Sequence, residues 1–257
     1  MRHETGFLDR SGYVVYLPAN YDASRSWPAI LFLHGSGERG TDAMRATQIG
    51  IGSVIRRDRS RVPAVVVFPI APEDSRWLGE PADAAMRALD QTLDEFNVDR
   101  DRVYLTGLSM GGYGAYHLAL ALPHRWAAMV VVCGGLLQHA TTTAVQQSPF
   151  IRTDERPRPP TPGVEPRVPR GRADEGVRPS DPYAFVAQSI RHIPIWLFHG
   201  ENDPVIPVEE SRRMSEQLRL ARADVHYTEY ANVEHNSWDR AYSDAQMWTW
   251  LFAQRRR

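Results

Sequence analysis

A serine flanked by glycines stands near the middle of the chain and could act as a nucleophile. Residues 107–111 read GLSMG and match Gly-x-Ser-x-Gly with Ser109 at the centre. In a nucleophile elbow such a serine occupies a strained turn between strand and helix, which lifts its hydroxyl off the sheet. The glycines are needed because a Cβ there would collide with the neighbouring strand or helix. The pentapeptide alone also fits a glycine-rich turn with an incidental serine, but strand-like and helix-like runs flank it here.

A serine hydroxyl reacts only if a base removes its proton, and that base needs an orienting partner. On a parallel sheet these groups are expected later in the chain, in the order Ser, Asp or Glu, His. Asp203 follows the apolar run 193–199, and His235 follows the alternating run 224–230. Both positions lie just past a predicted strand, where sheets of this kind carry their functional loops. The sequence therefore predicts a Ser109–His235–Asp203 triad.

Each of these residues also has a simpler interpretation when it is considered alone. Asp203 precedes a proline and could be a turn or capping residue. His235 could be an exposed loop histidine. Glu201 and Asp239 are the alternative acids, since Glu201 lies closer to its strand and Asp239 falls within a predicted helical turn.

Acyl transfer also needs two backbone N–H groups that stabilise the oxyanion. We expect one from Met110, at the start of the helix after the nucleophile. The other should come from the glycine-rich loop 35–40, with Ser36 as donor and Gly37 beside it in contact with substrate.

Several residues near these motifs have both a structural and a functional interpretation. Trp77 and Tyr113 could line a substrate pocket, although aromatic residues near a site are as often part of the core. Glu38 and Arg39 are expected to form an ion pair that shapes the oxyanion loop, and His34 to be a structural hydrogen-bonding residue.

The elements that would position these residues alternate between strands and helices. Strands are predicted at 12–18, 27–34, 62–70, 103–108, 126–133, 193–199 and 224–230. Helices are predicted around 42–55, at 82–96, after Ser109, at 208–221 and at 237–254. This alternation predicts an α/β fold with a mostly parallel central sheet and helices on both faces.

Residues 139–182 interrupt this pattern, since they hold nine of the 19 prolines and seven arginines. Few large apolar residues occur there, so the segment cannot form a core of its own. We interpret residues 1–257 as a single domain and this segment as an insertion, either a lid over the site or a disordered excursion.

The composition excludes several classes of protein. The net charge of -1 argues against a nucleic-acid partner, and no run is long and apolar enough for a membrane span. Cys133 is the single cysteine, so no intramolecular disulfide forms, and no cluster has the spacing of metal ligands.

The N-terminus lacks a signal-peptide apolar region, which predicts a cytoplasmic protein as written, or a secreted one already trimmed of its signal. The oligomeric state is not predicted.

Four segments resemble one known family. They are residues 34–40 (HGSGERG), 104–114 (YLTGLSMGGYG), 198–207 (FHGENDPVIP) and 234–238 (EHNSW). Together they are similar to α/β-hydrolase fold carboxylesterases related to feruloyl esterases and polyhydroxybutyrate depolymerases. The resemblance implies the triad and oxyanion donors named above, no cofactor, and a small-molecule or carbohydrate-linked ester as substrate, such as a short-chain acyl, acetyl or feruloyl ester.

Two other functions remain open at this stage. A peptidase of the prolyl-oligopeptidase-like type normally adds a gating domain, for which 257 residues leave no room. A non-catalytic binding protein on the same fold normally lacks a member of the triad, and none is lacking here.

Overall fold

The computed structural model describes residues 6–136 and 181–256, and their strands form one eight-stranded sheet. The strand order is β1-β2-β4-β3-β5-β6-β7-β8. β1 and β2 are antiparallel to their neighbours, whereas β3 to β8 all run parallel. The strands are β1 (Gly6–Arg10), β2 (Tyr13–Leu17), β3 (Trp27–Leu33), β4 (Val65–Pro69), β5 (Val98–Leu108), β6 (Ala128–Val132), β7 (Ile195–Gly200) and β8 (Val225–Tyr230). The predicted mostly parallel sheet is confirmed.

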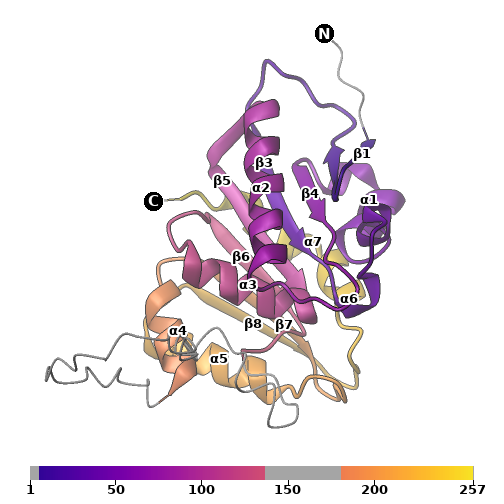
Figure 1. Ribbon diagram of the computed structural model, residues 1–257. Coiled ribbons are helices and arrows are strands. Elements are labelled where there is room, and N and C mark those ends of the chain that lie inside the picture. The colour runs from indigo at the N-terminus through magenta and orange to yellow at the C-terminus, as the bar shows by residue number, and fades with distance from the viewer. Residues whose placement is uncertain (1–5, 137–180, 257) are drawn as a thin grey trace, which may run out of the picture.

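Helices cover both faces of this sheet (Figure 1). α2 to α5 pack into the core on one face, and α1, α6 and α7 pack into the core on the other. The helices are α1 (Ile51–Arg57), α2 (Glu80–Glu95), α3 (Met110–Ala121), α4 (Pro182–Ile190), α5 (Glu209–Leu220), α6 (Trp238–Ser243) and α7 (Ala245–Ala253). Since each crossover between parallel strands contains a helix, the two-sided covering of the α/β-hydrolase fold is confirmed.

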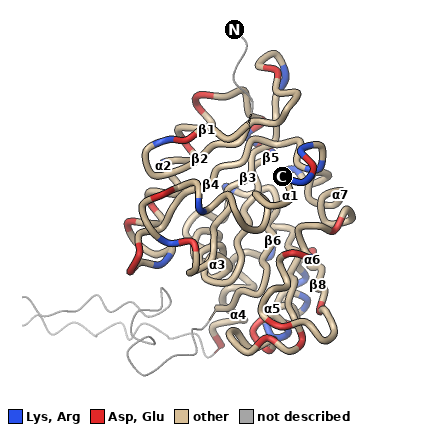
Figure 2. Tube along the Cα trace, turned by 90° about the vertical axis from the view of Figure 1, so that its right-hand side faces the viewer, with Lys and Arg blue, Asp and Glu red and all other residues tan. Residues whose placement is uncertain are grey.

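The central strands are apolar along their whole length because both of their faces are covered. Every residue of β3, β4 and β6 is buried. Figure 2 shows these strands without a charged residue, while acidic and basic residues mingle along the loops and outer helices. The sheet therefore holds the loops at its carboxyl edge on a rigid base.

Four elements differ from the sequence-based prediction. In place of one helix around 42–55 there is a short 3-10 helix, Ala43–Thr47, and then α1, which begins at Ile51. Strand β1 and helix α4 were not predicted, although Pro182 at the first turn of α4 is a favourable helix start. The single helix predicted at 237–254 is wrong, because it breaks at Asp244. This residue has an extended backbone, and its side chain accepts a hydrogen bond from the Gln246 amide, which starts α7 anew.

Most of the proline- and arginine-rich segment lies outside the described residues, which omit 137–180, so its predicted role as a lid or disordered excursion stays a prediction. Among the residues described, no helix has both the length and the apolar character that a membrane crossing requires.

Candidate active site

Ser109 occupies a strained turn between β5 and α3. Its backbone has φ 52° and ψ -118°, values that a residue with a side chain rarely adopts. A Cβ added to Gly107 would lie 2.2 Å from the Gly111 carbonyl oxygen, and one added to Gly111 would lie 1.9 Å from the Leu33 carbonyl oxygen. Neither glycine can be replaced without moving backbone, which is the steric requirement predicted for this elbow.

The Ser109 hydroxyl is the first member of a chain of hydrogen bonds. Its Oγ lies 2.9 Å from Nε2 of His235, and Nδ1 of His235 lies 2.7 Å from Oδ2 of Asp203. The Asp203 side chain is fully buried, whereas 18% of the His235 side chain is exposed. With the His235 proton on Nδ1, Nε2 is free to accept the serine proton, which is the geometry that general-base activation requires.

Both oxygens of the Asp203 carboxylate have hydrogen-bonding partners. Oδ1 accepts hydrogen bonds from the amides of Val205 and Ile206 at 2.8 and 2.9 Å. Oδ2 lies 3.2 Å from Nε2 of the buried His199, in addition to its bond with His235. Burial raises the pKa of Asp203, but the hydrogen bonds from the two histidines and the two amides lower it by more. The net pKa lies below the ordinary value, so this carboxylate remains charged at neutral pH.

The two alternative acids lie elsewhere. Glu201 is exposed and accepts a hydrogen bond from the Asn232 amide. Asp239 is also exposed and pairs with the Asn236 side chain. Among the three acids considered, Asp203 is the one that bonds to His235.

The loop after β3 lies directly beside the nucleophile. A Cβ on Gly35 would stand 3.6 Å from the Ser109 Cβ, and the next residues, Ser36 and Gly37, are exposed. Met110 is the first residue of α3, where backbone amides have no acceptor within the helix. The amides of Ser36 and Met110 therefore belong to the two segments that flank the Ser109 hydroxyl.

Two arginines hold this loop through its carbonyl groups. Arg45 donates to the carbonyls of Gly37 and Arg39 at 2.9 and 2.8 Å. Arg39 donates to the Ser36 carbonyl at 2.9 Å and to the Ser75 carbonyl at 3.3 Å. These bonds fix the peptide planes that follow Ser36, Gly37 and Arg39. The Ser36 amide shares its plane with the Gly35 carbonyl, which lies 2.6 Å from Nδ1 of His34.

The predicted ion pair between Glu38 and Arg39 is wrong. Within the described loop the Arg39 guanidinium donates to the carbonyls of Ser36 and Ser75 instead, so its donors are directed at the backbone rather than at Glu38. Burial raises the pKa of Glu38, while the amides of Gly35 and of Glu38 itself lower it. The Glu38 side chain thus folds back onto its own loop.

His34 and Trp77 support the loop from the core. His34 Nε2 accepts a hydrogen bond from the Ala71 amide at 3.0 Å, and burial lowers the pKa of His34 to about 4, so the ring is neutral. The Trp77 indole donates to the His34 carbonyl at 3.0 Å. Only 1% of Trp77 is exposed, which corrects the prediction that it lines a substrate pocket. His34 is the structural residue that was predicted.

Tyr113 lies on α3, four residues after the nucleophile, and is half-buried. The Tyr113 hydroxyl and the Glu210 carboxylate both face Gly135. A Cβ added to Gly135 would lie 2.8 Å from each of them. Burial raises the Tyr113 pKa, and the charges of Glu210 and Asp203 raise it further, so the phenol keeps its proton. Glu210 is buried and accepts a hydrogen bond from the Leu136 amide at 2.7 Å. The Tyr113 phenol can therefore donate a hydrogen bond, and its contact with substrate stays a prediction.

The positioning contacts of His199 and Arg45 and the place of Cys133 beside the triad were not predicted. His199 is four residues before Asp203, a spacing that could have suggested a contact between them. The contacts of Arg45 with carbonyls six and eight residues away depend on the conformation of the loop, and Cys133 meets groups from distant parts of the chain. Cys133 is fully buried below the site with φ 39°. Burial raises the pKa of its thiol by more than the Ser109 amide and Ser237 hydroxyl lower it.

The sheet order, the elbow and the Ser109–His235–Asp203 hydrogen-bond chain together define an α/β-hydrolase. A family model described as "Putative esterase" matches residues 9–255, and the chain belongs to this esterase family.

Named relatives agree with this assignment. The chain is 26% identical over 211 residues to "Probable feruloyl esterase C" of Aspergillus terreus, which covers 80% of this chain and 60% of that protein. It is 24% identical over 179 residues to "Bifunctional acetylxylan esterase/xylanase XynS20E" of Neocallimastix patriciarum, covering 69% of this chain and 18% of that protein. The structure resembles "Crystal Structure of a Thermostable Esterase" with a TM-score of 0.69 and 29% identity, covering 95% of this chain and 59% of the other. The chain thus spans less than two thirds of each of these proteins.

Proposed function

We propose that this protein is a serine carboxylic-ester hydrolase that works through an acyl-enzyme intermediate. The observation that carries the proposal is the hydrogen-bond chain from Ser109 through His235 to Asp203, at 2.9 and 2.7 Å. Membership of the esterase family supports the same chemistry. No step in this reaction requires a cofactor or a metal ion.

In the proposed reaction His235 Nε2 takes the Ser109 proton while Oγ attacks the ester carbonyl carbon. The carbonyl oxygen becomes an oxyanion, which the amides of Ser36 and Met110 stabilise. His235 then donates its proton to the leaving alcohol, which leaves an acyl group on Ser109. Water then attacks the acyl-enzyme while His235 takes its proton, and His235 returns that proton to Oγ of Ser109 as the acid leaves. Throughout, the Asp203 charge stabilises the protonated His235 ring.

For the substrate we propose an acetyl or feruloyl ester of a carbohydrate, or another short-chain acyl ester. The names of the feruloyl esterase and acetylxylan esterase relatives support this class. We assign Tyr113 a hydrogen bond to the substrate, and its half-buried, protonated phenol supports this role. Gly37 offers a surface without a side chain next to the oxyanion, since a Cβ there would meet nothing within 4 Å.

Hydrolysis of p-nitrophenyl acetate by the wild type and by Ser109→Ala tests the nucleophile. We expect a loss of at least about 10³-fold in kcat for this variant. Ser189→Ala is the matched control, because Ser189 is a half-buried serine on α4 whose hydroxyl donates only to the Phe185 carbonyl of its own helix. Equal rates for Ser109→Ala and the wild type would refute the proposed nucleophile.

A fluorophosphonate probe gives a second readout, since it labels an activated serine without turnover of an ester. Mass spectrometry should find the adduct on Ser109, and His235→Ala should not be labelled at a comparable rate. A panel of acetylxylan, feruloyl, short acyl and polyester substrates then tests the substrate class. If kcat/KM for peptide or amide substrates exceeded that for all of these esters, the ester assignment would be wrong.

A further inference from the structure

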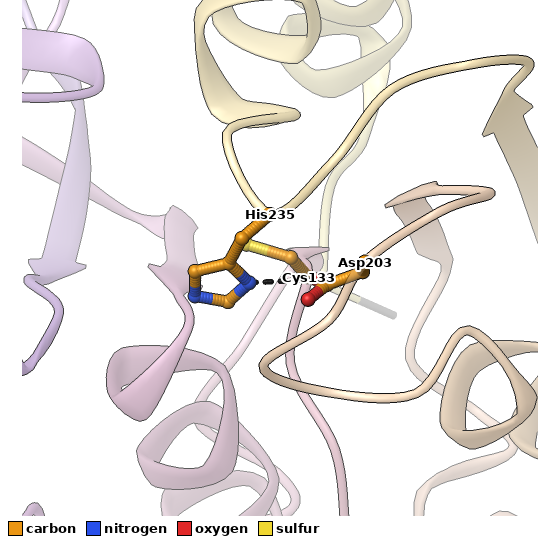
Figure 3. Close-up of side chains that lie close together, drawn as sticks. All are labelled: Cys133, Asp203 and His235. Atoms are coloured by element: carbon orange, nitrogen blue, oxygen red, sulfur yellow. Dashed lines mark hydrogen bonds and ion pairs between the residues drawn. The ribbon is translucent and has the colours of Figure 1, made fainter.

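Cys133, Asp203 and His235 bring a sulfur, an oxygen and a nitrogen ligand atom within 4.8 Å of one another. Figure 3 shows the three side chains converging from separate loops, with the Cys133 sulfur behind the His235 side chain. The thiol and the carboxylate are fully buried, and the imidazole is partly exposed. The proposed reaction uses the histidine and the aspartate, but it has no role for the thiol.

We propose that these three residues form an inhibitory site for a thiophilic divalent cation such as Zn²⁺ or Cd²⁺. The donor set is the one that such ions select, because thiolate and imidazole are soft or borderline ligands and a carboxylate often completes the set. Mg²⁺ and Ca²⁺ prefer oxygen ligands alone and should not bind here.

The geometry needs only small movements to accept the ion. A tetrahedral zinc ion with bonds of about 2.0–2.3 Å separates its ligand atoms by about 3.3–3.7 Å. The 2.7 Å contact between His235 and Asp203 would therefore open slightly, and the longer separations would close by roughly 1 Å. Solvent reaches the cluster from the His235 side, and water would complete the coordination.

The charges also balance. The ion replaces the thiol proton, which leaves for solvent, so a thiolate and a carboxylate neutralise the two positive charges of the ion. A neutral assembly is favourable in a buried place, where an isolated charge is strongly destabilised.

Binding at this place would stop the proposed reaction by changing the tautomer of His235. The ion occupies Nδ1, so the ring proton moves to Nε2, which then donates rather than accepts. Ser109 loses the base that lies 2.9 Å from its hydroxyl. This consequence rests on the proposed function, whereas binding of the ion does not.

The test measures p-nitrophenyl acetate hydrolysis after preincubation with Cd²⁺ or Zn²⁺, with each variant normalised to its own uninhibited rate. Even loss of an outer partner lowers metal affinity by about 10–100-fold. Cys133→Ala should therefore raise the half-inhibitory Cd²⁺ concentration at least about tenfold. Equal sensitivity of the wild type and Cys133→Ala, or no inhibition of the wild type by either ion, would overturn the site.

His226→Ala is the matched control, because His226 is exposed and pairs with Asp224 at 3.8 Å on the outer strand β8. Its sensitivity to Cd²⁺ should match that of the wild type, and Mg²⁺ should inhibit neither protein. A loss of inhibition in His226→Ala would place the ion on the surface and refute the proposal.

A binding measurement separates this proposal from the proposed function. Cadmium bound to a thiolate gives a charge-transfer band in the ultraviolet, which does not depend on turnover. We expect the band with the wild type and its absence in Cys133→Ser, a variant of similar size that preserves the packing. A wild type that hydrolyses no ester yet gives the band would refute the function and keep the site, whereas absence of the band would refute the site.

Discussion

The two sides of the candidate site are built in different ways. On one side Asp203 and His235 follow β7 and β8, and a buried network of side chains and amides fixes the carboxylate. On the other side the exposed residues Ser36 and Gly37 present backbone groups, and guanidinium groups on neighbouring residues hold the loop by its carbonyls.

This difference follows from the chemistry that each side would perform. A carboxylate that must stay charged while buried needs several hydrogen-bond donors, since otherwise it would take up a proton. An oxyanion hole needs only N–H groups, which every residue except proline carries, so the loop must be fixed by its shape rather than by its side chains. Changes on the first side should therefore have larger effects on catalysis than changes on the second.

The largest effect is expected for Asp203→Asn. An amide cannot neutralise the protonated His235, and it favours the wrong tautomer, so kcat should fall by about 10³–10⁴-fold. Steady-state hydrolysis of p-nitrophenyl acetate measures the change. Glu201→Gln, an exposed acid in the same loop, should stay close to the wild-type rate. A similar loss in both variants would mean that the loop, and not the Asp203 charge, is responsible.

Among the groups that support the loop after β3, His34 should contribute most to the pH dependence of the free energy of unfolding. Its folded pKa of about 4 lies below the ordinary 6.5, so between these values the unfolded chain binds a proton that the folded protein does not. The free energy of unfolding should therefore fall as the pH drops through this window, by about 3 kcal/mol in total.

Urea denaturation at pH 7 and pH 4.5 measures this loss. His34→Gln keeps an acceptor for the Ala71 amide but does not titrate, so it should lose less stability over the same range than the wild type. Identical losses in the two proteins would assign the pH dependence to other groups.

A smaller effect on activity is expected for His199→Gln. Loss of the contact at 3.2 Å removes one of the hydrogen bonds that lower the Asp203 pKa and orient the carboxylate. We expect kcat to fall by about 10–100-fold, as for a small misplacement of a reacting group. The pKa of Asp203 should also rise toward its ordinary value, which a carbon-13 NMR titration of its carboxyl group measures.

The titration of Asp203 distinguishes a positioning role of His199 from a loss of stability. His192→Gln is the control, because His192 is an exposed histidine that contacts only the Pro123 carbonyl. A lower kcat in His199→Gln with an unchanged Asp203 titration would contradict the role of His199 in lowering the Asp203 pKa.

The smallest effect is expected for Arg45→Ala. The loop would lose two carbonyl contacts, but Arg39 would still hold it, so kcat should fall by about tenfold with little change in KM. Arg45→Lys, which keeps the charge but not the fork of donors, should recover part of the loss. Arg57→Ala, on the exposed end of α1, is the control. A change confined to KM would indicate that Arg45 contacts substrate instead.

The sequence determined much of the fold and the principal residues of the site. Alternation of apolar runs with amphipathic runs predicted the parallel sheet, because buried strands and covering helices have different hydrophobic periods. The glycines around Ser109 were informative because a Cβ at either position would collide with neighbouring backbone. Asp203 and His235 were predictable from their order and from their places at the ends of strands.

Tertiary structure decided which neighbours serve these residues. The contacts of Arg45 with the Gly37 and Arg39 carbonyls and of His199 with Asp203 depend on side-chain rotamers and loop geometry, which local patterns do not encode. The burial of Trp77 depends on helix α3 closing over it, where Gly114 makes room. The meeting of Cys133 with Asp203 and His235 arises because β6, β7 and β8 end at one edge of the sheet. Sequence alone records the types and order of these residues, whereas their distances come from packing between parts of the chain that are far apart in sequence.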